Sequence, residues 1–145
     1  MAKLEEEDDP AATRPYYRLL GLRTEAGEPA GQSKLVLQSR AELENSRGDV
    51  HGGVIASLLD AAMGVAVRSA LTALEGATTA SLTVNYVAPG RSILTARARV
   101  VRQGRTLASA EATVTDVSER VVAHSVATLR IVRGGSSSRS SPARG

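Results

Sequence analysis

The sequence has 145 residues, 42% of them hydrophobic and 23% charged, which is typical of one globular domain rather than two. Aromatic residues make up only 2%, all of them Tyr, so the core must be packed from aliphatic side chains and Ala, and aromatic platforms for single-stranded nucleic acid are not expected. The absence of Cys excludes disulfides, a cysteine nucleophile and thiolate metal sites, and the two His argue against a structural zinc site.

The formal net charge is +3, and the charges are unevenly distributed along the chain. Acidic residues gather at positions 5–9, and arginines follow towards the other end, at Arg130, Arg133, Arg139 and Arg144. No helix dense in Lys and Arg is present, so we expect no nucleic-acid partner. An acidic start is unlike a signal peptide or an organellar presequence, and we therefore expect a cytoplasmic protein.

Two segments without apolar periodicity flank the predicted domain. Residues 1–14 form a charged tail, and residues 133–145 form a Gly/Ser/Arg tail, and both are predicted to be disordered. The domain itself is expected over 15–132, a length that supports one modest core.

The domain begins with a short predicted helix over 15–22, with Pro15 at an allowed first-turn position. A turn at 27–31 and a strand over 34–44 follow, and then the only long helix, predicted over 52–74.

Four runs rich in Val, Thr and Ile complete the domain, separated by short turns, and we predict strands over 79–87, 92–102, 106–117 and 120–132. Consecutive strands with tight turns favour an antiparallel sheet. The predicted class is α+β, a curved antiparallel sheet wrapped around the long central helix.

The long helix is apolar on nearly every face between Val54 and Val67, which is typical of a helix buried in a core or in a membrane. Asp60 in the middle of the run and Arg68 just after it argue against the membrane. We therefore expect a core helix, whose small residues let the sheet approach closely.

Asp60 is the residue of this helix that packing of the core explains least. An ionised carboxylate on an apolar helix is costly unless it is paired, hydrogen-bonded or open to a cavity. Arg68 lies eight residues on, about 12 Å along the axis, so a pair within the helix explains Asp60 poorly, while a pair with a strand arginine stays open. In a cleft, Asp60 is a candidate general base or nucleophile.

The sequence His51-Gly52-Gly53 stands at the start of the same helix. First-turn N–H groups are free donors at the positive end of the helix dipole, and they suit the negative charge of a tetrahedral oxyanion. His51 could donate to the same oxygen. A simple loop-to-helix turn and a surface histidine are the alternatives.

The spacing of these two features adds a constraint. Gly52 and Asp60 lie about 12 Å apart on one helix, so one reacting carbonyl cannot touch both. If they act together, they come from different subunits, where two helices lie antiparallel across an interface. The catalytic hypothesis thus predicts an obligate oligomer.

These residues resemble a known family. Asn45, His51-Gly52-Gly53 and Asp60, followed by a Thr-rich strand that ends in Tyr86 and Pro89, are similar to the hotdog-fold acyl-CoA thioesterases, most of all the phenylacetic-acid-degradation (PaaI-like) branch. The resemblance covers most of 15–132 and implies a homodimer with continuous sheets, commonly paired into a homotetramer.

The resemblance also implies roles. The Gly52 N–H would polarise the thioester carbonyl with the assistance of His51, and Asp60 of the other subunit would activate water or act as the nucleophile. Asn45 would orient the thioester or the water. Thr79 would contact the nucleophile side. The expected activity is metal-free and cofactor-free hydrolysis of acyl-CoA to a free acid and CoA.

Further residues are candidates for substrate or CoA binding: Gly53, Thr78, which neighbours Thr79, and Arg102 and Arg105, which flank the turn at Gly104. The arginines suit the phosphates of CoA, although a solvated outer face is an equal explanation. Two other functions stay open: an acyl-CoA-binding module without catalysis, and an acyl-thioester dehydratase or hydratase.

Overall fold

The computed structural model describes residues 14–134. Two α-helices, one 3₁₀ turn and six strands follow one another in the order α1 (Pro15–Leu20), β1 (Arg23–Thr24), β2 (Gln32–Gln38), η1 (Ala41–Leu43), α2 (Gly52–Ser69), β3 (Glu75–Tyr86), β4 (Ile93–Gln103), β5 (Leu107–Thr115) and β6 (Val121–Arg133).

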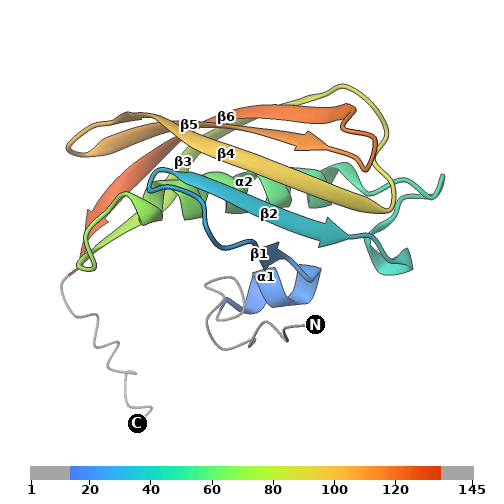
Figure 1. Cartoon of the computed structure of the whole chain (residues 1–145), viewed down its shortest axis with the longest axis horizontal. Helices are drawn as coiled ribbons and strands as arrows, with labels where there is room; N and C mark the ends of the chain where they lie inside the picture. Colours follow the sequence, from blue (N-terminus) through green and yellow to red (C-terminus); the bar gives the residue numbers. More distant parts are fainter. Residues whose placement is uncertain (1–13, 135–145) are drawn as a thin grey trace, which may run out of the picture.

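The strands form one antiparallel sheet in the order β1-β2-β4-β5-β6-β3. The long helix α2 lies along one face of this sheet, and α1 lies outside α2 (Figure 1). The predicted α+β class, with a curved sheet around a central helix, is confirmed. The 12-residue strand β3 is an edge of the sheet.

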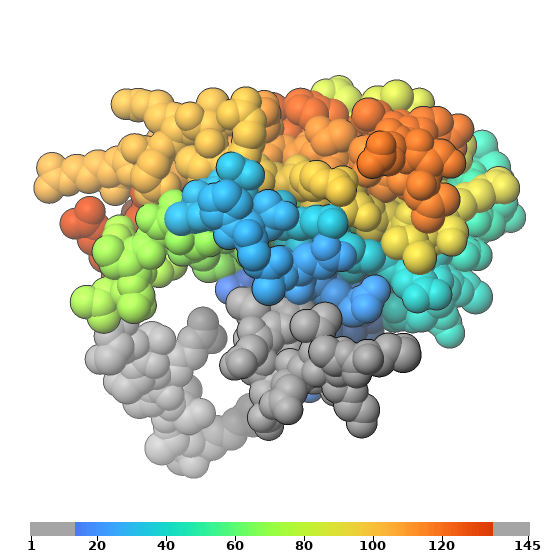
Figure 2. Space-filling model, in the orientation of Figure 1, coloured from blue at the N-terminus to red at the C-terminus, as the bar shows by residue number. Residues whose placement is uncertain are grey.

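The helix α2 packs closely because the sheet presents small side chains to it. Leu58, Leu59 and Met63 are fully buried, and the buried positions of β4 and β5 include Ala96, Ala98, Ala108, Ala110 and Ala112. The strands β2 and β4 cover the middle of α2 in the space-filling view (Figure 2). By length and composition α2 could cross a membrane, yet half of it is buried inside this fold, as the core-helix prediction requires.

Element boundaries differ from the prediction in several places, and β3 begins at Glu75 rather than at 79. The strand predicted over 34–44 ends at Gln38, because the chain turns through η1 and places Leu43 in the core. The helix predicted to 74 ends at Ser69, where the N–H groups of Ala70 and Leu71 close the last turn. The strand β1 is only two residues long and was not predicted.

The two predicted tails fall outside the described residues, with three exceptions. Arg14 precedes α1, Arg133 ends β6, and Gly134 donates from its N–H to the carbonyl of Leu74 at 2.8 Å.

Candidate active site

The loop before α2 is held together by Asn45. Its Oδ1 accepts hydrogen bonds from the N–H groups of Arg47 and Asp49, at 2.9 and 3.2 Å, while its own N–H donates to the Asp49 carbonyl. Gly48 completes the turn with a φ of 80°, which favours glycine. The Asn45 oxygen thus shapes the loop, and the two amide N–H donors of Asn45 are the atoms left for a ligand.

His51 is the N-cap of α2. Its Nδ1 accepts a hydrogen bond from the N–H of Gly53 at 2.9 Å, so in the neutral ring the proton lies on Nε2. The Gly53 N–H, a predicted binding group, is therefore already used. No acceptor for the Gly52 N–H is found among residues 14–134, which leaves this donor free at the positive end of α2.

Tyr86 closes the other side of this helix end. Its hydroxyl donates to the Gly52 carbonyl at 2.6 Å, and its ring lies so close that a Cβ on Gly52 would meet it at 3.4 Å. We did not predict Tyr86 as a site residue, although it stands in the Tyr-x-x-Pro pattern. Its spacing from the glycine pair gave no sign that the two would touch.

A pocket of about 330 Å³ opens beside this helix end. Asn45, Gly52 and Tyr86 line it together with Asp49 and the segment Val87–Gly90. Asp49 is buried at its wall and forms an ion pair with Arg91. The pocket brings together the predicted Asn45 and Gly52.

Asp60 lies on α2 opposite β3. The hydroxyl of Thr79 donates to its Oδ1 at 2.6 Å. The carboxylate is only partly buried, and no ion pair of residues 14–134 involves it, so the hydrogen bond from Thr79 takes the place of the strand arginine that the sequence left open. A register shift at Ala80 interrupts the pairing of β3 with β6 just after Thr79, and the adjacent Thr78 is exposed.

One chain therefore carries two half-sites. The free Gly52 N–H begins α2, and Asp60 with Thr79 lies eight residues later, about 12 Å along the axis. A single carbonyl cannot contact both within one chain.

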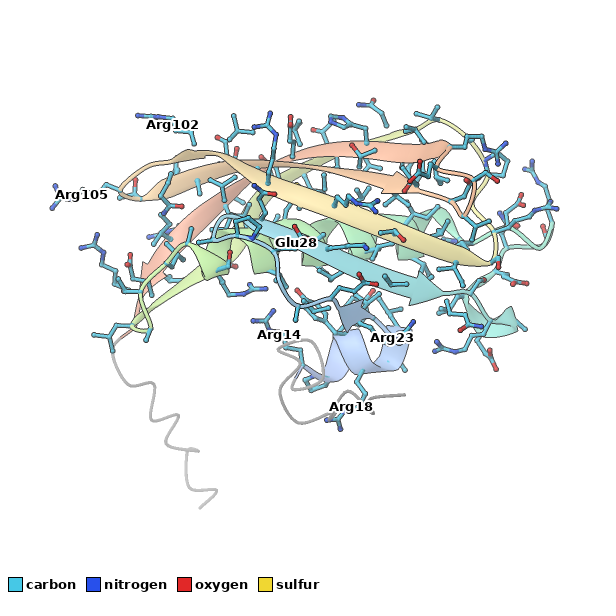
Figure 3. All side chains as sticks on the ribbon, in the orientation of Figure 1. Arg14, Arg18, Arg23, Glu28, Arg102 and Arg105 are labelled. Carbon is cyan, nitrogen blue, oxygen red and sulfur yellow. The ribbon has the colours of Figure 1, made fainter. Side chains whose placement is uncertain are left out.

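The predicted arginines are elsewhere. Arg102 and Arg105 lie at the far tip of the β4–β5 hairpin and are exposed (Figure 3), at the opposite end of the sheet from the start of α2 (Figure 1). Within residues 14–134 no cluster of three His, Asp or Glu side chains could hold a metal ion.

Comparison with known proteins shows the family of this chain. The sequence pattern of the thioesterase superfamily matches residues 47–123, which include Gly52, Asp60 and Thr79. A protein of Halobacterium salinarum described as a candidate esterase is 44% identical over 89 residues. That match covers 58% of this chain and 59% of the relative, so the chain spans less than two thirds of the relative's length.

Solved structures share the fold. A thioesterase family protein of Silicibacter pomeroyi is 31% identical, with a TM-score of 0.80 over 85% of this chain and 93% of that one. The Escherichia coli PaaI protein of the phenylacetic acid degradation operon has a TM-score of 0.76 at 23% identity, over 85% and 86%. A Bacillus halodurans protein solved with CoA is 32% identical, with a TM-score of 0.67 over 68% and 66%.

Proposed function

The chain belongs to the thioesterase superfamily, with the hotdog fold, and on that premise we propose that it hydrolyses acyl-CoA thioesters to a free acid and CoA. The observation that carries the proposal is the pair of half-sites on α2: a free N–H at Gly52 and a carboxylate held by Thr79 at Asp60. Each group is one that thioester hydrolysis requires.

In the proposed reaction Asp60 takes a proton from a water molecule, and the water oxygen attacks the thioester carbon. The negative charge that develops on the carbonyl oxygen is stabilised by the Gly52 N–H and the dipole of α2. When the tetrahedral intermediate collapses, the C–S bond breaks and the thiolate of CoA leaves. A thiolate is a good leaving group, so no strong general acid is needed.

The neighbouring residues support these two groups. Thr79 donates to one oxygen of Asp60, which fixes the carboxylate and leaves its other oxygen for water. His51 holds the first turn of α2 through Gly53 and keeps Nε2 for the carbonyl oxygen. The amide of Asn45 reaches the same pocket as Gly52 and orients the thioester or the water.

The active unit that we propose is a homodimer. The edge strand β3 has no partner on its outer side among residues 14–134, and a second copy pairing there would continue the sheet and set the two α2 helices antiparallel. Gly52 of one chain would then lie near Asp60 of the other. Pairing of two dimers gives the homotetramer that the resemblance implies.

CoA binding is supported by the Bacillus halodurans relative, which was solved with CoA. Arg102 and Arg105, at the exposed tip of the β4–β5 hairpin (Figure 3), are our candidates for phosphate contacts with CoA bound at the start of α2 of the other chain. Gly53 and Thr78 would line the path of the thioester.

We place the protein in the cytoplasm, where acyl-CoA is made and used.

The test is thiol release from a panel of aryl-CoA and fatty acyl-CoA substrates. Steady release of CoA supports the proposal. Tight binding without release would instead identify an acyl-CoA-binding module, and water addition to an enoyl-CoA without release would identify a hydratase.

A further inference from the structure

Arg68 on α2 is folded back over Gly64. A Cβ on Gly64 would lie 2.9 Å from one terminal nitrogen of Arg68 and 3.4 Å from the guanidinium carbon. Side chains on a helix point towards its N-terminus, so the guanidinium lies on the side of Gly64 that leads to Asp60. The rise of the helix places Gly64 about 6 Å along the axis from Asp60.

Within residues 14–134 this guanidinium has no negative partner. Its Nε is buried and has no hydrogen-bond acceptor, and a terminal nitrogen reaches only the neutral hydroxyl of Tyr17, at 3.4 Å. None of the ion pairs within residues 14–134 includes Arg68. Burying part of a charge without compensation is costly, and the cost is removed when an anion binds.

A second arginine adds to the positive charge at this place. Arg14 lies over the ring of Tyr17, with its guanidinium carbon 5.2 Å from the ring centre, and its Nη1 is also buried without an acceptor. Figure 3 shows Arg14 beside α1, on the side that faces α2. Tyr17 thus contacts both guanidinium groups, and we call Arg14, Tyr17, Gly64 and Arg68 the arginine cluster.

We propose that the arginine cluster binds the free carboxylate of a dicarboxylic acyl group, so that the enzyme acts on short ω-carboxyacyl-CoA thioesters. The inference rests on the proposed function, because the reacting carbonyl must lie at Asp60. A chain that begins there and ends at Arg68 is short, since the guanidinium lies about one helical turn away.

The phosphates of CoA are a poorer occupant. The whole pantetheine arm separates them from the thioester sulfur, so they cannot reach a cation this close to the reacting carbonyl. A carboxylate fits a guanidinium through two parallel hydrogen bonds, and the two terminal nitrogens of Arg68 form such a pair, one of them now donating only to the Tyr17 hydroxyl.

The experiment compares kcat/KM for glutaryl-CoA with that for pentanoyl-CoA, which has the same chain length without the carboxylate. The wild type is expected to prefer glutaryl-CoA by about 10- to 100-fold, the range for hydrogen bonds to a charged group. Arg68→Gln is expected to remove the preference, and Arg68→Lys to keep part of it. Arg23→Gln, which changes an exposed arginine of β1, is the matched control.

Gly64→Ala provides a variant that keeps every charge. Alanine favours a helix over glycine, and the three side-chain atoms nearest to the new methyl group all belong to the flexible end of Arg68, so the protein is expected to fold at least as stably as the wild type. The displaced guanidinium is expected to lose the preference for glutaryl-CoA.

An equal kcat/KM for the two thioesters in the wild type would overturn the inference while leaving thioester hydrolysis established. Dissociation of the oligomer in Arg68→Gln would also overturn it, because that result would mean that Arg68 of the wild type contacts a second copy of the chain rather than a substrate carboxylate. If neither thioester is hydrolysed, the proposed function fails. In that case, titration calorimetry on Asp60→Asn compares the Kd of glutaryl-CoA with that of pentanoyl-CoA. Tighter binding of glutaryl-CoA, lost when Arg68→Gln is added, would support the arginine cluster as the carboxylate site.

Discussion

At the scale of single residues, the proposed chemistry depends on the carboxylate of Asp60, which lies on an otherwise apolar helix. Asp60 stood out in the sequence as a candidate, because packing does not explain a charged side chain on an apolar helix, and its catalytic role stays a prediction. Its partner Thr79 was predicted only through a family resemblance, with Thr78 as the neighbour, and the structure distinguishes them by the hydrogen bond to Asp60. Tyr86 and the arginine cluster were missed because their contacts join residues far apart in the chain.

The bond between Thr79 and Asp60 leads to a prediction. Thr79→Val keeps the shape of the side chain but removes the hydroxyl, so Asp60 loses the donor that orients it. We expect kcat to fall by about 10- to 100-fold with a small change in KM, since a hydrogen bond to a charged group is lost. Thr113→Val on β5 is the matched control. Equal losses in both variants would contradict a specific role for Thr79.

At the scale of elements, the helix and the four long strands were predictable because their apolar patterns are long. The ends of the elements were less predictable. The strand before α2 ends early because the chain turns through η1 and places Leu43 in the core. The short strand β1 is defined only by its pairing with β2. The register shift after Thr79 has no signal in the sequence, although it lies beside the contact of Thr79 with Asp60.

The turn between β5 and β6 is held by Asp116. Partial burial acts to raise the pKa of this carboxyl, but hydrogen bonds from the N–H groups of Arg120 and Ser118, together with the charge of Arg120, lower it below its usual range. A group with a lowered pKa in the folded state stabilises the protein above its unfolded pKa, and this stability is lost as the pH falls through the folded pKa.

We therefore expect Asp116→Asn to have a lower Tm than the wild type at pH 7, with a difference that shrinks below about pH 4. Thermal unfolding followed by circular dichroism across this pH range measures it. Glu119→Gln, a charge change in the same turn, is the control. A difference in Tm that is constant from pH 7 to pH 3 would contradict the role of the ionised carboxylate.

At the scale of the whole molecule, one chain is insufficient for the proposed reaction. The spacing of Gly52 and Asp60 predicted this on the condition that the two groups act together, and the described fold keeps them on one helix with an open edge strand beside them. How a second copy would complete the proposed site depends on the geometry of the assembly, which no local sequence pattern encodes.

Mixing two inactive variants tests the shared site. Gly52→Pro removes the N–H donor at a helix position that tolerates proline, and Asp60→Asn removes the base. Each homodimer is expected to be inactive. A mixed dimer has one site with both defects and one with neither, so about half of the wild-type activity per mixed dimer should return. If mixing restores nothing, Gly52 and Asp60 do not act across an interface.

The most direct test of thioester hydrolysis at Asp60 is the rate of thiol release by purified Asp60→Asn with the best acyl-CoA of the panel. The asparagine can still accept the hydrogen bond of Thr79, so the fold and the oligomer should stay intact by circular dichroism and size-exclusion chromatography. We expect kcat to fall by about 100- to 10,000-fold, the contribution of a general base. Hydrolysis within a few-fold of the wild type would contradict the account.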